Sequence, residues 1–264
     1  MNYELPNTVR IQEVIDEAEG MRSLIFPRVI DARPGQFVML WVPGVDAKPV
    51  GVSYLSSDRI GVTVSVVGAW SEKVCSMKPG EYLGLFGPYG NGFELEGKCI
   101  AIIGGGYGTA SLMLLVEEAL RLKYDITLIV GARTEKKLLY LKRIQELGVD
   151  AIFTTDDGSF GRTGTNLRAL EDLLKTKKID TVYGCGPELM EKSLAEFCVS
   201  KGLCCYVSLE RHMKCGFGVC GACSMDPSGK RVCCEGPVFR AEEALEFTEF
   251  GKYHRDGSAA KHYF

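Results

Sequence analysis

The sequence lacks the features that would direct a protein into a membrane, out of the cell or onto nucleic acid. The longest uncharged stretch, residues 99–116, is interrupted by the glycines of residues 104–108, which suit a strand–loop–helix turn better than a membrane span. The N-terminal residues have neither the basic start nor the apolar run of a signal peptide. The net charge of −3 gives no general attraction to nucleic acid or to an anionic membrane. We therefore expect a cytoplasmic protein that binds neither.

Cysteine, by contrast, is abundant, with 11 residues in a chain of 264. A secreted disulfide framework needs an oxidising compartment, so we expect reduced thiols that act as core residues, metal ligands or redox groups. Five of them lie among apolar neighbours and are expected to be small buried hydrophobic residues, namely Cys75, Cys99, Cys198, Cys204 and Cys205.

The chain length favours two domains and a small appendage. Residues 1–95 predict an antiparallel β-barrel, because short strands with period-two alternation are separated by Pro-Gly turns. Residues 96–207 predict a doubly wound parallel sheet, because apolar strands alternate with helices. The barrel strands include 8–11, 22–26, 37–42 and 61–67; the later strands are 100–103, 125–130, 151–154 and 180–184, with helices at 109–122, 135–147, 166–174 and 187–200.

Residues 208–264 follow neither pattern. Residues 210–239 are rich in Cys and Gly, which indicates loops organised around a metal centre. Residues 240–264 are expected to form a polar, loosely packed tail.

The cysteines of this segment have a spacing that indicates an iron–sulfur site. Cys215, Cys220 and Cys223 form C-x4-C-x2-C, and Cys233 or Cys234 can supply a distant fourth thiolate, as in plant-type [2Fe–2S] sites. The intervening glycines let the backbone approach the cluster. Structural zinc is the alternative, but zinc ligands usually come as two C-x2-C pairs, whereas the first gap here is four residues.

A glycine-rich loop, residues 104–109, joins a predicted strand to a predicted helix. Bare N–H groups beside a helix N-terminus favour a pyrophosphate, which makes the loop a candidate nucleotide site through Gly104, Gly105, Gly106 and Gly108. The loop is not G-x-G-x-x-G, and the second strand does not end in an acidic residue, so a simple tight turn is the alternative. Residues 156–158 and 185–187 end two further strands where open parallel sheets bind ligands, although either can be merely a turn.

Together these features resemble the ferredoxin–NADP reductase superfamily, whose modules bind FAD on a barrel and a nicotinamide dinucleotide on a parallel sheet. Residues 208–220 and 232–239 narrow the resemblance to the electron-transfer subunits of NAD-dependent dihydroorotate dehydrogenase, over nearly the whole chain. The resemblance implies FAD, a [2Fe–2S] cluster and NAD as cofactors. It also implies an FMN-binding dihydroorotate dehydrogenase catalytic subunit as partner, in a heterotetramer of two of each, and a role in pyrimidine biosynthesis.

The resemblance further implies which residues bind these groups. The fourth cluster ligand lies three residues before a Gly-Pro pair, which selects Cys233 over Cys234. Lys48 replaces an Arg and keeps the charge without the guanidinium fork, while Gly51 lacks a hydroxyl for which Ser53 is a candidate substitute. Trp70 is expected either to stack on FAD or to pack on the barrel. The implied FAD residues are Lys48, Pro49, Val50, Gly51, Ser53, Ser65, Val66, Val67, Trp70 and Ser71; those for the nucleotide are the loop glycines with Asp157, Cys185 and Gly186.

The implied cofactors have complementary chemistry. A [2Fe–2S] cluster moves one electron at a time and NAD accepts a hydride, so a flavin has to stand between them. No general acid or base is required, and no residue is predicted to be catalytic in that sense, although Cys185 is a candidate for shaping the hydride site. The alternatives are a diaphorase-type subunit of a cytosolic hydrogenase, a sulfide dehydrogenase or a ferredoxin–NADP transhydrogenase, which share this architecture, or a zinc-stabilised binding module.

Overall fold

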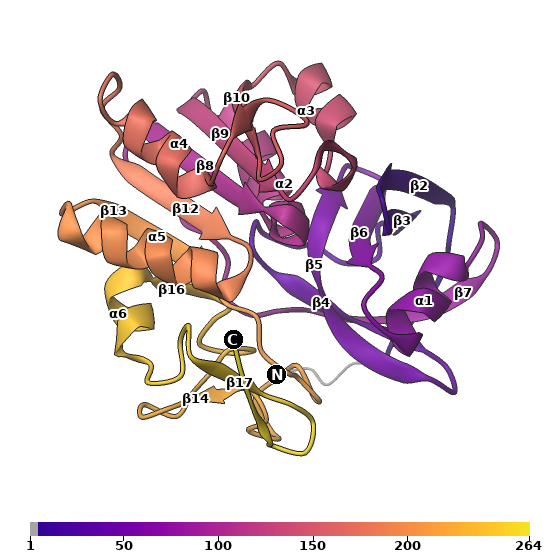
Figure 1. Ribbon diagram of the computed structural model, residues 1–264. Coiled ribbons are helices and arrows are strands. Elements are labelled where there is room, and N and C mark those ends of the chain that lie inside the picture. The colour runs from indigo at the N-terminus through magenta and orange to yellow at the C-terminus, as the bar shows by residue number, and fades with distance from the viewer. Residues whose placement is uncertain (1–4) are drawn as a thin grey trace.

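The computed structural model describes residues 5–264 and contains two seven-stranded sheets that lie side by side (Figure 1). The first is a curled, fully antiparallel half-barrel with strand order β1-β7-β4-β5-β6-β3-β2. Helix α1 (Ala69–Ser76) connects its last two strands in sequence. The strands are β1 (Asn7–Arg10), β2 (Glu13–Ala18), β3 (Met21–Pro27), β4 (Phe37–Val42), β5 (Asp46–Leu55), β6 (Arg59–Ser65) and β7 (Tyr82–Tyr89).

The second sheet has the order β11-β10-β9-β8-β12-β13-β16 and is parallel except for its last strand. Its central strand β8 is apolar throughout because both of its faces are covered: Ala101 and Ile103 pack with α4 and α5, and Ile100 and Ile102 pack with α2 and α3. The strands are β8 (Cys99–Gly105), β9 (Asp125–Ala132), β10 (Asp150–Thr155), β11 (Arg162–Thr163), β12 (Thr181–Cys185), β13 (Cys204–Ser208) and β16 (Val238–Arg240); the helices are η1 (Gly106–Gly108), α2 (Thr109–Arg121), α3 (Leu141–Leu147), α4 (Asn166–Leu173) and α5 (Glu188–Ser200).

This architecture confirms the predicted fold class, with one local error. The helix predicted over 135–147 is a short 3₁₀ turn, η2 (Glu135–Lys137), followed by an extended stretch and then α3. Leu138 and Leu139 turn into the core at 2% and 0% exposure, and Tyr140 adopts a left-handed conformation with φ 64°. Burial of these side chains therefore overrides the local helix propensity.

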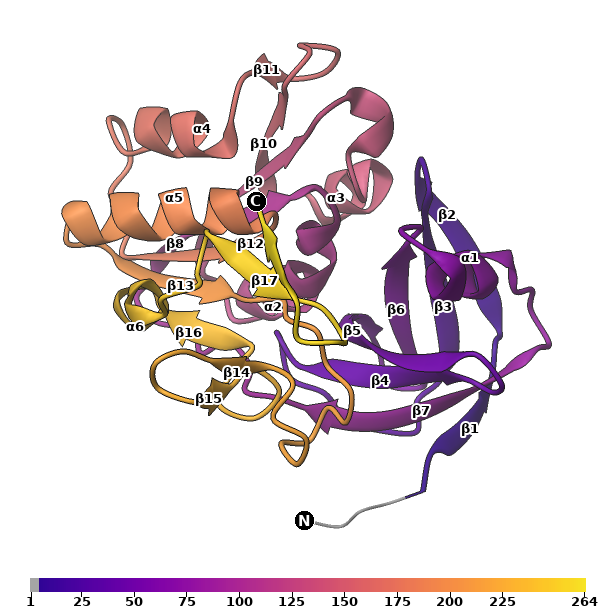
Figure 2. The ribbon, with the colours of Figure 1, turned by 60° about the horizontal axis from the view of Figure 1, so that its bottom comes forward.

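The C-terminal residues do not form the loosely packed tail that their composition indicates. They form α6 (Ala241–Glu246) and a hairpin of β17 (Tyr253–Arg255) and β18 (Lys261–Tyr263), which lies beside the start of α5 (Figure 2). Apolar residues separated by charged ones bury one face of this segment, so an amphipathic pattern was mistaken for a polar one. Ala241, Ala244, Phe247 and Phe250 are all at most 3% exposed.

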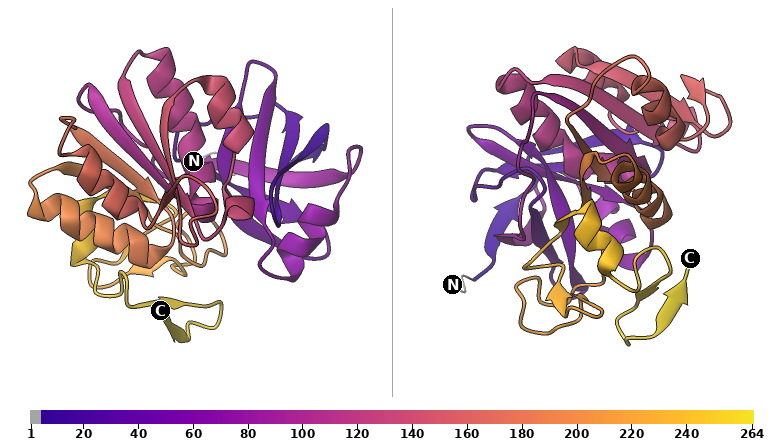
Figure 3. Two further views of the ribbon diagram at one scale, coloured as in Figure 1. Left: turned by 45° about the horizontal axis from the view of Figure 1, so that its top comes forward. Right: turned by 90° about the vertical axis from the view of Figure 1, so that its left-hand side faces the viewer.

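Side chains of the half-barrel and of the parallel sheet pack against each other, and Figure 3 shows the two sheets side by side from two further directions. The Tyr140 hydroxyl bonds that of Thr63 on β6, and its ring meets the Tyr54 ring edge-on at 5.9 Å. The Arg143 guanidinium lies 3.7 Å from the centre of the Tyr54 ring and forms an ion pair with Glu117. Among residues 5–264 no helix is long and apolar enough to cross a membrane.

We predict that Tyr140→Ala lowers the free energy of unfolding by about 3–5 kcal/mol, because it leaves a cavity between the two sheets. Tyr140→Phe keeps the ring and loses only the bond to Thr63, so it should cost about 1 kcal/mol. Urea unfolding followed by circular dichroism measures both variants. If the Tyr140→Ala variant were as stable as the wild type, this ring would have no role in joining the sheets.

Candidate cofactor and metal site

Three cavities meet where the half-barrel faces the carboxyl ends of the parallel strands. The inner cavity, about 150 Å³, lies between β5, α2 and the residues that follow β12 and β13. The barrel cavity, about 510 Å³, runs along β5, β6 and α1. The sheet cavity, about 660 Å³, lies over the ends of β8, β9 and β10. Tyr107, from the glycine loop, lines all three.

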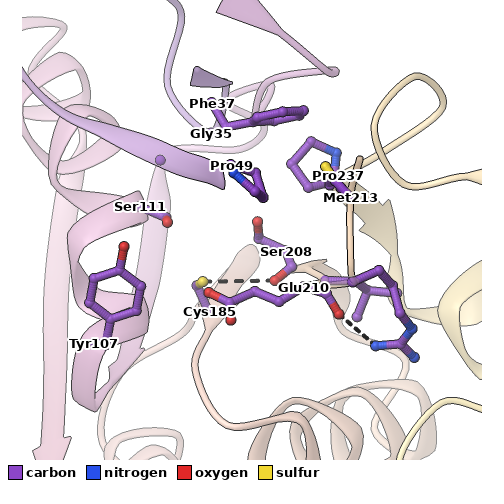
Figure 4. A pocket seen from close by; sticks show the side chains of 13 residues that line it. Gly35, Phe37, Pro49, Tyr107, Ser111, Cys185, Ser208, Glu210, Met213 and Pro237 are labelled. Atoms are coloured by element: carbon purple, nitrogen blue, oxygen red, sulfur yellow. Dashed lines mark hydrogen bonds between the residues drawn. The ribbon is translucent and has the colours of Figure 1, made fainter. Parts of the chain in front are cut away.

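The inner cavity is framed by residues from all three regions of the chain (Figure 4). Gly51 lines its barrel side and approaches α2 closely, because a Cβ there would lie 2.6 Å from the Ser111 hydroxyl oxygen. On the opposite side the Cys185 thiol donates to the Ser208 carbonyl at 3.7 Å, and the Glu210 carboxylate points toward Cys185. Burial and the nearby Glu191 and Glu210 raise the pKa of Cys185 well above its usual value, so its thiol stays neutral.

Two loops pack against each other at the border of the inner and sheet cavities. A Cβ on Gly108 would lie 2.5 Å from the Gly186 nitrogen, and one on Gly105 would lie 2.8 Å from Pro187 Cδ. Buried Glu191 accepts a hydrogen bond from the Gly186 N–H at 2.9 Å and so fixes the second loop. Burial raises the pKa of Glu191 well above its usual value. The glycines therefore serve close approach of the two loops.

The sheet cavity offers backbone and basic groups to a dinucleotide. Gly106 has φ +51° and faces open space, which leaves its peptide accessible. The Asn166 side-chain amide donates to the Gly104 carbonyl at 2.9 Å and so fixes the start of the glycine loop. Arg133, Lys137 and Asp156 line the far end. Asp157 does not line it, because its carboxylate accepts from the backbone and hydroxyl of Ser159 at 3.0 and 2.6 Å.

The barrel cavity collects most of the residues expected to bind FAD. Lys48 lies in an ion pair with Asp46 at 2.6 Å, and Trp70 donates to the Asp46 carbonyl at 3.2 Å. The Ser71 hydroxyl accepts from the N–H groups of Val67 and Gly68, and so shapes the start of α1. The expected residues that line this cavity are Lys48, Pro49, Val50, Ser65, Val67, Trp70 and Ser71.

Two expected residues lie elsewhere. Ser53 is fully buried inside the half-barrel, where its hydroxyl bonds that of Thr63 at 2.9 Å, so it does not substitute for the hydroxyl that Gly51 lacks. Val66 is 42% exposed and does not line the barrel cavity, although both of its neighbours do. The barrel cavity combines apolar residues with the charged side chains of Lys48, Glu210 and Arg211, and an apolar surface with a few polar groups suits a flavin dinucleotide.

The candidate cysteines lie in a compact lobe, residues 215–235, which contains the small hairpin of β14 (Ser224–Met225) and β15 (Lys230–Arg231). The N–H of Cys220 donates to Cys215 Sγ at 3.5 Å, and the N–H of Cys233 donates to Cys223 Sγ at 3.4 Å. Cys234 Sγ is 3.9 Å from Cys233 Sγ. Within residues 5–264 no three His, Cys, Asp or Glu side chains are already gathered around one metal position.

The lobe nevertheless stabilises thiolates, the form that ligates iron. Burial raises the pKa of Cys215, but N–H groups of residues 217–220 outweigh it and bring the pKa to about 7. Hydrogen bonding from Cys233 lowers the pKa of Cys223 to about 6. The same pairing with Cys223 raises the pKa of Cys233. This donor set fits a thiolate-bound cluster.

A buried ion-pair network ties the C-terminal hairpin to the inner cavity. Arg211 donates to both oxygens of Glu188 at 2.5 and 2.8 Å, and these side chains are 4% and 10% exposed. The Gly251 N–H donates to Glu188 at 2.8 Å, and Arg255 joins Glu249 to Asp226. The network fixes the first turn of α5 next to Cys185.

Several cavity residues were not predicted from the sequence. Four of the six lie within residues 208–213, at and after the end of β13. A charged pair, Glu210-Arg211, directly after an apolar strand was the available signal, because ligands bind at such strand ends. The residues are Tyr107, Ser111, Ser208, Glu210, Arg211 and Met213.

Comparisons with known proteins agree with this geometry. Residues 210–245 match the family described as the iron–sulfur cluster binding domain of dihydroorotate dehydrogenase B, and residues 102–196 match the oxidoreductase NAD-binding domain. A Methanocaldococcus jannaschii protein named "Probable dihydroorotate dehydrogenase B (NAD(+)), electron transfer subunit" is 41% identical over 99% of this chain and 100% of its own length. A Pyrococcus furiosus protein of the same name is 38% identical over 94% and 95%.

Solved structures support the same relationship. A structure of NADH-dependent reduced ferredoxin–NADP oxidoreductase superposes with a TM-score of 0.81 at 30% identity, covering 92% of this chain and 91% of that one. The FAD/NAD binding domain of a Vibrio cholerae nitric oxide dioxygenase has a TM-score of 0.65 at 16% identity, over 76% and 95%, and shows the fold alone.

Fold and site define an iron–sulfur oxidoreductase of the ferredoxin–NADP reductase type, with a nicotinamide dinucleotide site on its parallel sheet. More narrowly, the chain belongs to the family of electron transfer subunits of NAD⁺-dependent dihydroorotate dehydrogenase B.

We predict that Cys220→Ser and Cys233→Ser each abolish the visible iron–sulfur absorption and most of the bound iron, because each removes one of the four thiolates proposed as ligands. Cys234→Ser should retain both, although its sulfur lies next to that of Cys233. Iron analysis and visible spectra of the purified variants decide the assignment. A cluster retained in Cys233→Ser but lost in Cys234→Ser would transfer the ligand role to Cys234.

Proposed function

We propose that this chain takes electrons from the FMN-containing catalytic subunit of dihydroorotate dehydrogenase and passes them through a [2Fe–2S] cluster and FAD to NAD⁺, in cytoplasmic pyrimidine biosynthesis. One observation supports this most directly: the three candidate sites adjoin in that order. Met213 and Pro237, on either side of the cysteine lobe, line the inner cavity, and Tyr107 borders both the inner and the sheet cavity.

In this proposal the protein binds, orients and shields three groups. FAD supplies the exchange between single-electron and hydride transfer. Lys48 and the other residues of the barrel cavity would hold FAD, and Pro49 and Gly51 would contact it from the inner cavity. The glycine loop holds the nicotinamide dinucleotide, with Cys185 and Gly186 at the border. A neutral Cys185 thiol places no anion beside the nicotinamide.

The four cysteines Cys215, Cys220, Cys223 and Cys233 hold the cluster at one edge of the molecule. Cys220 is exposed, as is its neighbour Val219, so this part of the lobe is available to a partner. Within residues 5–264 the large sheets are a half-barrel and an open sheet, and neither is a closed αβ barrel in which dihydroorotate would be oxidised. The proposal therefore requires the catalytic subunit, and the assembly that we propose is a heterotetramer of two of each.

A second candidate function has one specific observation in its favour. The ferredoxin–NADP oxidoreductase structure matches this chain over nearly its whole length at 30% identity, so a transhydrogenase-type complex is the competing assignment.

We predict that the purified chain alone forms no NADH from dihydroorotate, whereas the complex with its co-purifying FMN subunit does. The reason is that the chain holds the electron route but no dihydroorotate site. Absorbance of NADH at neutral pH measures this, with NADH oxidation by an artificial acceptor as the control that the isolated chain is active. NADH formation by the chain alone would refute the division of labour. A partner that supports ferredoxin-dependent reduction of NADP, and not dihydroorotate oxidation, would establish the second candidate.

A further inference from the structure

Three aromatic rings form a line between the cysteine lobe and the inner cavity. Phe217 lies in the loop between Cys215 and Cys220, and its ring centre is 6.0 Å from that of Tyr89, at the end of β7. The Tyr89 ring centre is 6.0 Å from that of Phe37, on β4. Phe37 lines the inner cavity, so the line runs from one candidate site to the other.

Side chains and backbone of the half-barrel and of the lobe pack against these rings, of which Phe37 is buried and Tyr89 and Phe217 are half-buried. A Cβ on Gly216 would lie 2.6 Å from Met39 Cγ and 3.4 Å from Tyr89 Cδ2, so the cysteine loop rests directly on β4 and β7. Phe37 and Met39 belong to the same buried core as Cys223 and Cys233, and Tyr89 packs against that core. Packed protein atoms therefore connect the lobe to the cavity.

The position of Tyr89 is fixed from both directions. Two residues further on, Asn91 donates its N–H to the Gly236 carbonyl at 2.6 Å and its side-chain amide to the Glu235 carbonyl at 3.0 Å. The chain after β7 is thereby bound to the chain after Cys233. Burial raises the pKa of Tyr89, so its hydroxyl is neutral beside the lobe.

We propose that Phe217, Tyr89 and Phe37 form the medium through which single electrons cross between the cysteine lobe and the inner cavity, which rests on the cofactors of the proposed function. Electronic coupling decays with distance, and it decays more steeply across gaps than through packed atoms. Each electron leaves the reduced cluster and arrives at the flavin, and the rings are neither oxidised nor reduced. No proton moves in this step. Tyr89 contributes only its ring, which lies between the rings of Phe37 and Phe217.

A competing route runs through covalent bonds. Met213 lines the inner cavity and is two residues from Cys215, so the backbone of residues 213–215 also connects the two sites. The two routes make different demands on Tyr89: its ring is essential to the first and irrelevant to the second.

The deciding variant is Tyr89→Leu in the full chain loaded with cluster and FAD. After flash photoreduction, the change in absorbance with time gives the rate at which electrons redistribute between the cluster and FAD. Because leucine leaves a void in the place of the ring, we expect transfer to slow by about tenfold or more. The midpoint potentials of both groups and the electron paramagnetic resonance spectrum of the cluster should match those of the wild type, which a merely structural defect would not preserve.

Two matched variants separate the ring from general effects on packing. Tyr89→Phe keeps the ring and should transfer electrons within about twofold of the wild-type rate. Phe86→Leu removes a ring from the same strand, one that pairs with Trp41 at 6.5 Å and lies outside the line, and should also stay within about twofold. If Tyr89→Leu does not retain its cluster, Phe37→Leu interrupts the line on β4, away from the cysteine loop, and should slow transfer likewise.

A wild-type rate in loaded Tyr89→Leu, or in loaded Phe37→Leu, would overturn the proposal and assign transfer to the backbone of residues 213–215. Failure of the wild-type chain to bind FAD or the cluster would instead count against the proposed function. The two failures are therefore distinguishable in one series of measurements.

Discussion

One continuous apolar core holds the half-barrel, the parallel sheet and the cysteine lobe in a fixed relation. Met39 of β4, Val182 of β12 and Cys233 of the lobe are members of it, together with Phe239 of β16. Protein interiors are packed as densely as organic crystals, so parts that share a core do not drift relative to one another. A route that passes electrons among three bound groups depends on constant separations, and this core is what keeps them constant.

The same requirement explains the two glycine-bearing loops. Gly108 and Gly186 approach so closely that neither position has room for a side chain. The buried Glu191 fixes the second loop by accepting a hydrogen bond from its backbone. The sheet cavity and the barrel cavity adjoin each other and share Ser65, Val67 and Tyr107 as lining residues. Glycine here allows the two loops, and with them the cavities that they border, to lie close together.

Local patterns in the sequence were sufficient for the fold class, the cysteine motif and the glycine loop, because spacing and periodicity are local properties. They failed where distant contacts decide the structure. Tyr140 leaves the expected helix to reach Thr63, which is far away in sequence. Ser53 points into the half-barrel because β5 changes register between Val52 and Tyr54, and such an irregularity redirects side chains. Glu210 and Arg211 line the inner cavity only because β5, α2 and the end of β12 fold around them, which no local pattern indicates.

The position of the cysteine lobe within the second sheet has a consequence for biogenesis. Strands β13 and β16 are neighbours, with Ser208 paired to Val238, and the lobe is the connection between them. Because synthesis proceeds from the N-terminus, the half-barrel and the parallel strands can be complete before the cysteines leave the ribosome. The surface of Met39 and Tyr89, on which Gly216 packs, belongs to that earlier part of the chain. The order of synthesis therefore allows the cysteine loop to fold against a surface that is already in place.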